Sequence, residues 1–171
     1  KRTGINAVKN INKSGVAGFI EKVFKVCFVM IAVIALNYVF IEQNYSLLIP
    51  ISYLETKMIG YIGIVLSFTG LLFGFIAQLQ MGDAWRLGYN EKEQPSLVDK
   101  KLFAYSRNPI YLGIVVSNLG FFLMMPNALS LCFLVLSYVA ISIKIRLEEG
   151  YLIQSIGQDY KDYLKRVRRW I

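Results

Sequence analysis

The fold is decided by residues 108–143, NPIYLGIVVSNLGFFLMMPNALSLCFLVLSYVAISI, a run of 36 residues without a charged side chain. At about 1.5 Å per helical residue, such a run is long enough to cross a hydrocarbon core of about 30 Å twice. Pro126-Asn127 interrupts the run once, which predicts a tight helical hairpin. A second uncharged run covers the 25 residues from Met58 to Gly82. The chain is therefore expected to be an integral membrane protein.

The overall composition agrees with this expectation. Of the 171 residues, 56% are hydrophobic and 18% are charged, whereas soluble domains have about 45–50% and about 25%. The two cysteines, Cys27 and Cys132, lie singly in apolar segments and form no metal-binding or disulfide pattern. The sequence contains no histidine, which excludes histidine-based acid–base catalysis and histidine metal ligation. We expect no metal site.

The hydrophobic pattern divides the chain into spans and connections. Residues 42–57 contain Pro50 and are too short for another span, so a turn or an interfacial segment is expected there. Gly70 and Gly74 form a Gly-x-x-x-Gly pattern that permits close helix packing. The sequence predicts an all-α, polytopic membrane protein with a charged, amphipathic tail from Lys144 onward and four spans, Val23–Ile41, Met58–Leu79, Pro109–Met125 and Ala128–Ile143.

The distribution of basic residues predicts the orientation. Of the 19 Lys and Arg residues, 18 fall in the N-terminal arm, the 80–107 loop and the tail, and one falls in the 42–57 connection. The positive-inside rule then places both termini and the long loop in the cytoplasm. Attraction to anionic lipid accounts for the net charge of +8, so no nucleic-acid partner is expected.

The first polar motif is SRNPIYLG, residues 106–113, at the start of the third span. Asn108 followed by Pro109 is typical of an N-cap and the first helical residue. The free N–H groups of a helix start, with Arg107 beside them, suit a carboxylate or a phosphate.

Two further motifs follow the hairpin. Arg146, Glu148 and Glu149 lie where the fourth span emerges, and we expect either an ion pair with Arg107 or a ligand ammonium group held between them. Residues 156–163, IGQDYKDY, form an amphipathic segment with two tyrosines three positions apart.

In this order, the three motifs resemble the integral-membrane methyltransferases typified by isoprenylcysteine carboxyl methyltransferase, with phospholipid methyltransferases as relatives. The family pattern is Arg-His-Pro-x-Tyr-x-Gly, an uncharged hairpin, Glu-Glu, and then Phe-Gly-x-x-Tyr-x-x-Tyr. The resemblance covers residues 80–171, and residues 1–79 then form an N-terminal arm with two spans. Three positions depart from the family, because Asn108 replaces the histidine, Lys101 stands where glycine is frequent, and Ile156 replaces the aromatic residue.

The resemblance implies transfer of a methyl group from S-adenosyl-L-methionine to a lipid-like or prenylated acceptor, in the inner membrane of a prokaryote. Arg107, Arg146 and Glu148 would serve the acceptor and the catalytic step, with either arginine receiving an anionic group of the acceptor. Glu149 suits the ammonium group of the cofactor, and the helix start at Asn108 suits its carboxylate. The residues implied in cofactor binding are Ser96, Leu97, Val98, Phe103, Asn108, Tyr111 and Glu149.

Two other classes of protein remain open at this point. A reductase of the sterol-reductase type, which binds NADPH, has a similar C-terminal half but usually needs more spans. A small membrane scaffold or transport subunit is the non-enzymatic alternative. The centres of the predicted spans carry no ionisable side chain, which argues against an ion path.

Overall fold

The computed structural model describes residues 15–40, 42–82 and 96–171, and within these residues it contains helices and no strands. Four long helices form the body of the molecule. Short 3-10 turns and one short α-helix complete it. The elements are α1 (Val16–Phe40), η1 (Glu42–Leu48), η2 (Ser52–Leu54), α2 (Lys57–Met81), η4 (Lys101–Ala104), α3 (Pro109–Met124), α4 (Ala128–Ile156) and α5 (Gln158–Arg166).

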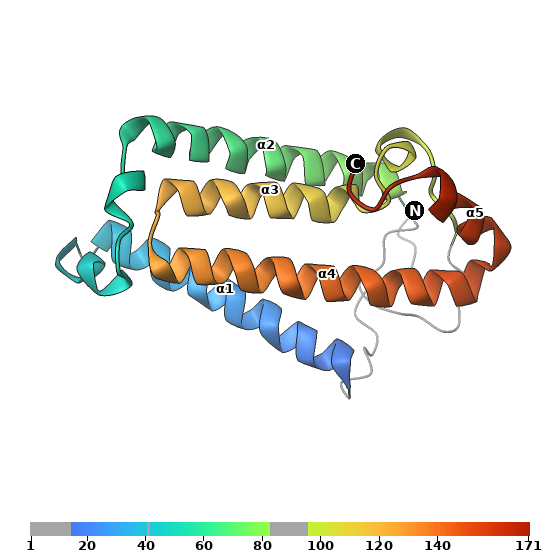
Figure 1. The fold of residues 1–171 in the computed structure, drawn as a ribbon, viewed down its shortest axis with the longest axis horizontal. Coiled ribbons are helices and arrows are strands. Elements are labelled where there is room, and N and C mark those ends of the chain that lie inside the picture. Colours follow the sequence, from blue (N-terminus) through green and yellow to red (C-terminus); the bar gives the residue numbers. More distant parts are fainter. Residues whose placement is uncertain (1–14, 41, 83–95) are drawn as a thin grey trace, which may run out of the picture.

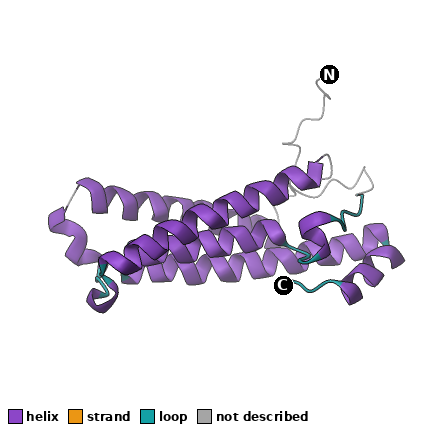
Figure 2. Cartoon of the chain, turned by 90° about the horizontal axis from the view of Figure 1, so that it is seen from above, coloured by secondary structure: helices purple, strands orange, loops and turns teal. Residues whose placement is uncertain are grey.

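The long helices lie side by side in an elongated bundle. α3 packs against both α2 and α4, and α1 packs against the other side of α4 (Figure 1). Seen from above, the described loops are short and gather at the two ends of the bundle (Figure 2). α5 and the C-terminus lie at the end where α3 begins, so residues distant in sequence meet there (Figure 1).

The predicted hairpin is present as α3 and α4, with its turn at Met125–Asn127. Asn127 begins α4 with a capping box, because its side chain accepts from the Ser130 amide and the Ser130 hydroxyl accepts from the Asn127 amide. The prediction that a separate tail begins at Lys144 is wrong. α4 continues through this charged stretch to Ile156 and ends at Gly157, whose φ of 75° favours glycine.

Of the other two predicted spans, the second agrees closely with the structure, and the first is predicted to begin too late. α2 spans Lys57–Met81, whereas α1 begins at Val16, seven residues before its predicted start. The 42–57 connection folds into two 3-10 turns and is tied to the hairpin turn. There, the Ile51 amide donates to the Pro126 carbonyl at 2.8 Å, and the Ala128 amide donates to the Ile49 carbonyl at 3.0 Å.

The helix surfaces have the character of a lipid-facing exterior. Large apolar side chains are exposed along the helices, including Phe28 at 78% and Phe68 at 68%. Among the described helices, α2 and α4 are long and apolar enough to cross a membrane, and α3 is a shorter apolar helix. The chain is an all-helical integral membrane protein.

α2 and α3 approach each other through glycine. A Cβ atom added at Gly70 would lie 2.5 Å from the Ser117 nitrogen and 2.6 Å from the Gly113 oxygen, both of which are backbone atoms of α3. The glycines of the predicted packing pattern therefore let two backbones meet, as in other membrane helix pairs. This contact fixes α3, whose first residues carry the polar motif.

Candidate functional site

The site lies at the end of the bundle where α3 begins. Pro109 is the first helical residue of α3, as predicted. The turn η4 leads into it and is anchored to α2, because the Leu102 amide donates to Gln80 Oε1 at 3.0 Å. Lys101 adopts a φ of 58°, a left-handed conformation that favours glycine, the residue expected at this position from the resemblance.

Residues 167–170, which we call the strap, return across the start of α3. The Arg107 amide donates to the Arg168 carbonyl at 3.0 Å. The Asn108 side-chain amide donates to the Arg169 carbonyl at 3.2 Å. The Trp170 ring stacks on Tyr138 of α4, with ring centroids 6.2 Å apart. The strap therefore joins the start of α3 to α4.

The prediction that Asn108 and Pro109 stand at the N-cap and the first helical position of α3 is confirmed. Asn108 occupies the N-cap position, but its side chain makes no capping hydrogen bond. The backbone of Asn108 has a φ of −133° and a ψ of 52°. Its side chain points toward the strap, where its amide group donates a hydrogen bond to the Arg169 carbonyl. Its own backbone amide donates to the hydroxyl of Ser106, which is 2% exposed.

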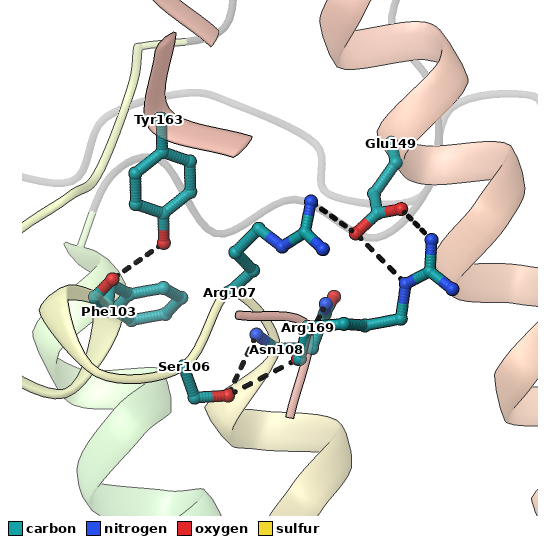
Figure 3. A network of polar contacts seen from close by, with 7 residues as sticks. All are labelled: Phe103, Ser106, Arg107, Asn108, Glu149, Tyr163 and Arg169. Carbon is teal, nitrogen blue, oxygen red and sulfur yellow. Dashed lines mark hydrogen bonds and ion pairs between the residues drawn. The ribbon is translucent and has the colours of Figure 1, made fainter. Parts of the chain in front are cut away.

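Glu149 is the centre of a buried charge cluster. Its side chain is 9% exposed and accepts from Arg169 at 2.7 Å and 3.3 Å, and it lies 3.5 Å from Arg107. The two guanidinium groups approach this carboxylate from two sides (Figure 3). The hydrogen bonds to Glu149 raise the pKa of Arg169. Of the two expected arrangements, the ion pair between Glu149 and Arg107 is present, and Arg169 adds a second cation at the same carboxylate.

The cluster has an excess of positive charge and one unused donor. Two guanidinium groups share one carboxylate, and the side chain of Arg107 is 13% exposed. The Arg107 Nε atom is buried without a hydrogen-bond partner among the described residues. A buried N–H group without an acceptor is costly, so this position suits a carboxylate oxygen of a ligand.

Glu148 belongs to a different group. It accepts from the Tyr111 hydroxyl at 2.8 Å and pairs with Lys144 at 3.2 Å. The structure thus brings Arg107 and Glu149 together, and Tyr111 and Glu148 together. Arg146 is exposed, and no ion pair joins it to either group within the described residues.

Two of the residues that the resemblance implies in cofactor binding, Leu97 and Phe103, contact an aromatic cluster. Tyr160 is 4% exposed and Tyr163 2%, and Leu97 packs against them. The Tyr163 hydroxyl donates to the Phe103 carbonyl at 2.6 Å (Figure 3). Burial raises the pKa of Tyr163 to about 12. Burial also raises the pKa of Tyr160, with a further contribution from the charge of Glu149. Phe103 is buried, Val98 half-buried and Ser96 exposed.

We expect Tyr163→Phe to lower the free energy of unfolding by about 1–2 kcal/mol, because it leaves the Phe103 carbonyl without its donor. The pKa of Tyr163 is higher in the folded protein than in the unfolded chain, so the folded state binds the proton more tightly. Its contribution is complete below about pH 10 and is lost as the pH rises toward 12. Unfolding in detergent between pH 8 and 12 should therefore show a smaller alkaline loss in Tyr163→Phe.

Tyr105→Phe is the matched control for this prediction, because Tyr105 is 76% exposed. It should leave both the stability and its alkaline decrease unchanged. Identical pH profiles for Tyr163→Phe and the wild type would contradict the assignment.

Three residues that build the site were not predicted from the sequence, namely Arg169, Ser106 and Gln80. The oxygen atoms of Gln80 and Ser106 hold the two segments that lead into α3. The basic cluster at 165–169 was the available signal for Arg169, but its partner could not be read from spacing.

Comparison with known proteins shows which families and folds this chain resembles. The model of the phospholipid methyltransferase family matches residues 58–159, from the start of α2 to the start of α5. The protein-S-isoprenylcysteine O-methyltransferase of Saccharomyces cerevisiae is 31% identical over 117 residues, which are 67% of this chain and 49% of that protein. A probable protein-S-isoprenylcysteine O-methyltransferase of Oryza sativa subsp. indica is 25% identical over 140 residues, 79% of this chain and 72% of that protein.

The fold also matches a solved structure. The eukaryotic intramembrane Ras methyltransferase, isoprenylcysteine carboxyl methyltransferase, superimposes with a TM-score of 0.64 at 21% identity, covering 92% of this chain and 53% of that chain. This chain spans about half the length of the yeast relative and of the solved structure. Since the family model covers more than half of the chain, including the helical hairpin and both glutamates, this protein belongs to the phospholipid methyltransferase family.

Proposed function

We propose that this protein transfers a methyl group from S-adenosyl-L-methionine to a lipophilic acceptor at the membrane surface. The observation that carries the proposal is the Arg107–Glu149–Arg169 cluster at the start of α3, in a chain of the phospholipid methyltransferase family. The yeast and rice relatives are named as O-methyltransferases of isoprenylcysteine, which supports a prenylated carboxylate as the acceptor class.

The residues present fit this cofactor. Its amino-acid part offers a carboxylate and an ammonium group, and the site offers the donor amide of the Asn108 side chain and a buried carboxylate at Glu149. Both kinds of contact are charge-assisted hydrogen bonds. The buried Arg107 Nε, which has no acceptor among the described residues, suits the anionic group of the acceptor molecule. The apolar surfaces of Leu97 and Phe103 beside the tyrosine cluster suit the adenine ring.

S-adenosyl-L-methionine, when bound, supplies a reactive sulfonium methyl group that needs only an aligned nucleophile. The protein's work is then to position the two reactants and to exclude water. We assign the cofactor to Ser96, Leu97, Val98, Phe103, Asn108, Tyr111 and Glu149. Arg107 and the exposed Arg146 would receive the anionic group of the acceptor, and Glu148 would orient Tyr111 through its hydrogen bond.

Calorimetry in detergent tests the proposal directly. S-adenosyl-L-methionine or S-adenosylhomocysteine should bind with a dissociation constant in the micromolar range or tighter, and NADPH should give no heat. Saturable NADPH binding without a response to either sulfur nucleotide would favour the reductase alternative. Absence of binding by all three would leave the scaffold alternative.

We further propose that α1, α2, α3 and α4 all cross the membrane and that both termini face the cytoplasm, from the distribution of basic residues. In a variant with Cys27 and Cys132 replaced by alanine, single cysteines at 53 and 161 provide the test. Both positions are exposed in the structure. An impermeant maleimide should label position 53 in intact cells and position 161 only after lysis. Labelling of both positions in intact cells would refute this topology.

A further inference from the structure

Arg169 forms hydrogen bonds with two of the polar side chains that the proposed function assigns to the cofactor. The Arg169 guanidinium binds the Glu149 carboxylate through two hydrogen bonds, at 2.7 Å and 3.3 Å. The carbonyl of the same residue accepts from the Asn108 side-chain amide at 3.2 Å. Glu149 and Asn108 are the positions proposed for the ammonium group and the carboxylate of the cofactor. Arg169 thus fills both positions at once (Figure 3).

The chemistry of Arg169 at these contacts resembles that of an α-amino acid. A guanidinium group replaces the ammonium cation at Glu149, and a carbonyl oxygen replaces a carboxylate oxygen at Asn108. Both protein groups are satisfied in this way without a ligand, which avoids the cost of leaving a buried carboxylate without a donor. We propose that Arg169 is a resident substitute for the amino-acid part of the methyl donor, and that the donor binds by displacing it. This inference rests on the proposed function.

The contacts of the cluster make the exchange feasible. The Arg169 side chain is 38% exposed, whereas that of Glu149 is 9% exposed. When Arg169 leaves, Glu149 still faces Arg107 at 3.5 Å, so no buried carboxylate is left without a cation. An incoming ammonium group restores the second charge-assisted contact. The exchange therefore replaces one cation by another at the same carboxylate.

The strap should move with the side chain. Its backbone is bound to the start of α3 through the Arg168 and Arg169 carbonyls, and the Trp170 ring is stacked on Tyr138. Loss of the Arg169 contacts removes the attachment of its carbonyl to Asn108 together with the attachment of its guanidinium group to Glu149. The surroundings of the Trp170 ring should therefore change when the donor binds, and the fluorescence of Trp170 should report this change.

Because Arg169 competes for the site, the apparent affinity for the donor is the intrinsic affinity multiplied by the fraction of molecules in which the site is open. We expect Arg169→Ala to bind S-adenosylhomocysteine about 10-fold more tightly than the wild type, since one charge-assisted contact no longer has to be broken. Arg169→Lys keeps the charge but not the two-pronged donor, and its affinity should lie between the two. Isothermal titration in detergent measures all three.

Arg168→Ala is the matched control. It removes one positive charge from the same strap, but the Arg168 side chain is exposed and has no ion pair among the described residues. Its carbonyl contact with Arg107 is a backbone contact and stays. Its affinity for S-adenosylhomocysteine should equal that of the wild type.

Fluorescence gives a second measurement that does not depend on activity. The chain has two tryptophans, so Trp85→Phe leaves Trp170 as the single emitter. Added S-adenosylhomocysteine should change the Trp170 emission with saturation at the dissociation constant found by titration. In Arg169→Ala, the change should saturate at about 10-fold lower concentration.

The outcomes separate this inference from the proposed function. Weaker or unchanged binding by Arg169→Ala, with normal binding by the wild type, would overturn the inference and leave the methyltransferase assignment intact. Binding without any change in Trp170 emission would also overturn it. Absence of S-adenosylhomocysteine binding in the folded wild type and in Arg169→Ala would reject both.

Discussion

Gly70→Ala is expected to lower the free energy of unfolding by about 2–3 kcal/mol, because a methyl group has no space between α2 and α3. The new Cβ atom would lie 2.5 Å from the Ser117 nitrogen and 2.6 Å from the Gly113 oxygen. Both are backbone atoms in the middle of a helix, so the contact is relieved only by moving the helices apart. Thermal or denaturant unfolding in detergent measures the loss.

Gly60→Ala is the control on the same helix. A Cβ atom at Gly60 meets nothing within 4 Å, so only the higher helix propensity of alanine remains, worth about 1 kcal/mol or less. This variant should be as stable as the wild type or more stable. Equal destabilisation by both substitutions would show that the two glycines act through helix flexibility and not through the contact with α3.

The helical hairpin was predictable because its signals are local. A long uncharged run and one Pro-Asn step are read directly from the sequence, and α3 and α4 meet within three residues of that step. The end of α4 was missed for a physical reason. Lys144 marks where an apolar span can stop, but a charged residue does not end a helix. Gly157, with its positive φ, ends it thirteen residues after Lys144.

The sequence predicted that α2 packs closely against another helix through its glycines, but it did not predict that this helix is α3. The Gly-x-x-x-Gly spacing indicates that some backbone comes close to α2. Which helix approaches depends on contacts between residues about fifty positions apart, such as the Ser67 hydroxyl donating to the Ser117 carbonyl at 3.2 Å. Spacing within one segment carries no information about such a partner.

The same distinction applies to the site. The ion pair between Arg107 and Glu149 was predictable, since both residues stand where helices of one hairpin reach the same end of the bundle. Arg169 was not, because the strap is held by carbonyl oxygens at 168 and 169, and every residue has a carbonyl. Backbone contacts of this kind have no sequence signature, so the second cation at Glu149 appears only in the structure.

Glu149→Gln should lower the free energy of unfolding by about 3 kcal/mol, because it leaves two guanidinium groups without their carboxylate. Arg107 contributes most of this loss, since its side chain is 13% exposed, whereas that of Arg169 is 38% exposed and can turn toward water. A free carboxylate at this position would instead leave the melting temperature nearly unchanged. Thermal unfolding of the ligand-free protein distinguishes the two cases.

Glu148→Gln is the matched control, one residue away on the same helix. Its carboxylate is 34% exposed and pairs with Lys144, which is 32% exposed, so the expected loss is below about 1 kcal/mol. The same pair of variants tests the site. If Glu149 receives the donor ammonium, Glu149→Gln should weaken S-adenosylhomocysteine binding by about 10- to 100-fold. Glu148→Gln keeps an oxygen that can accept from the Tyr111 hydroxyl, so its effect on binding should be much smaller. Loss of stability without loss of binding would make Glu149 a structural counter-ion of Arg107 alone. Equal effects of both variants on binding would point to the general negative charge at this end of α4.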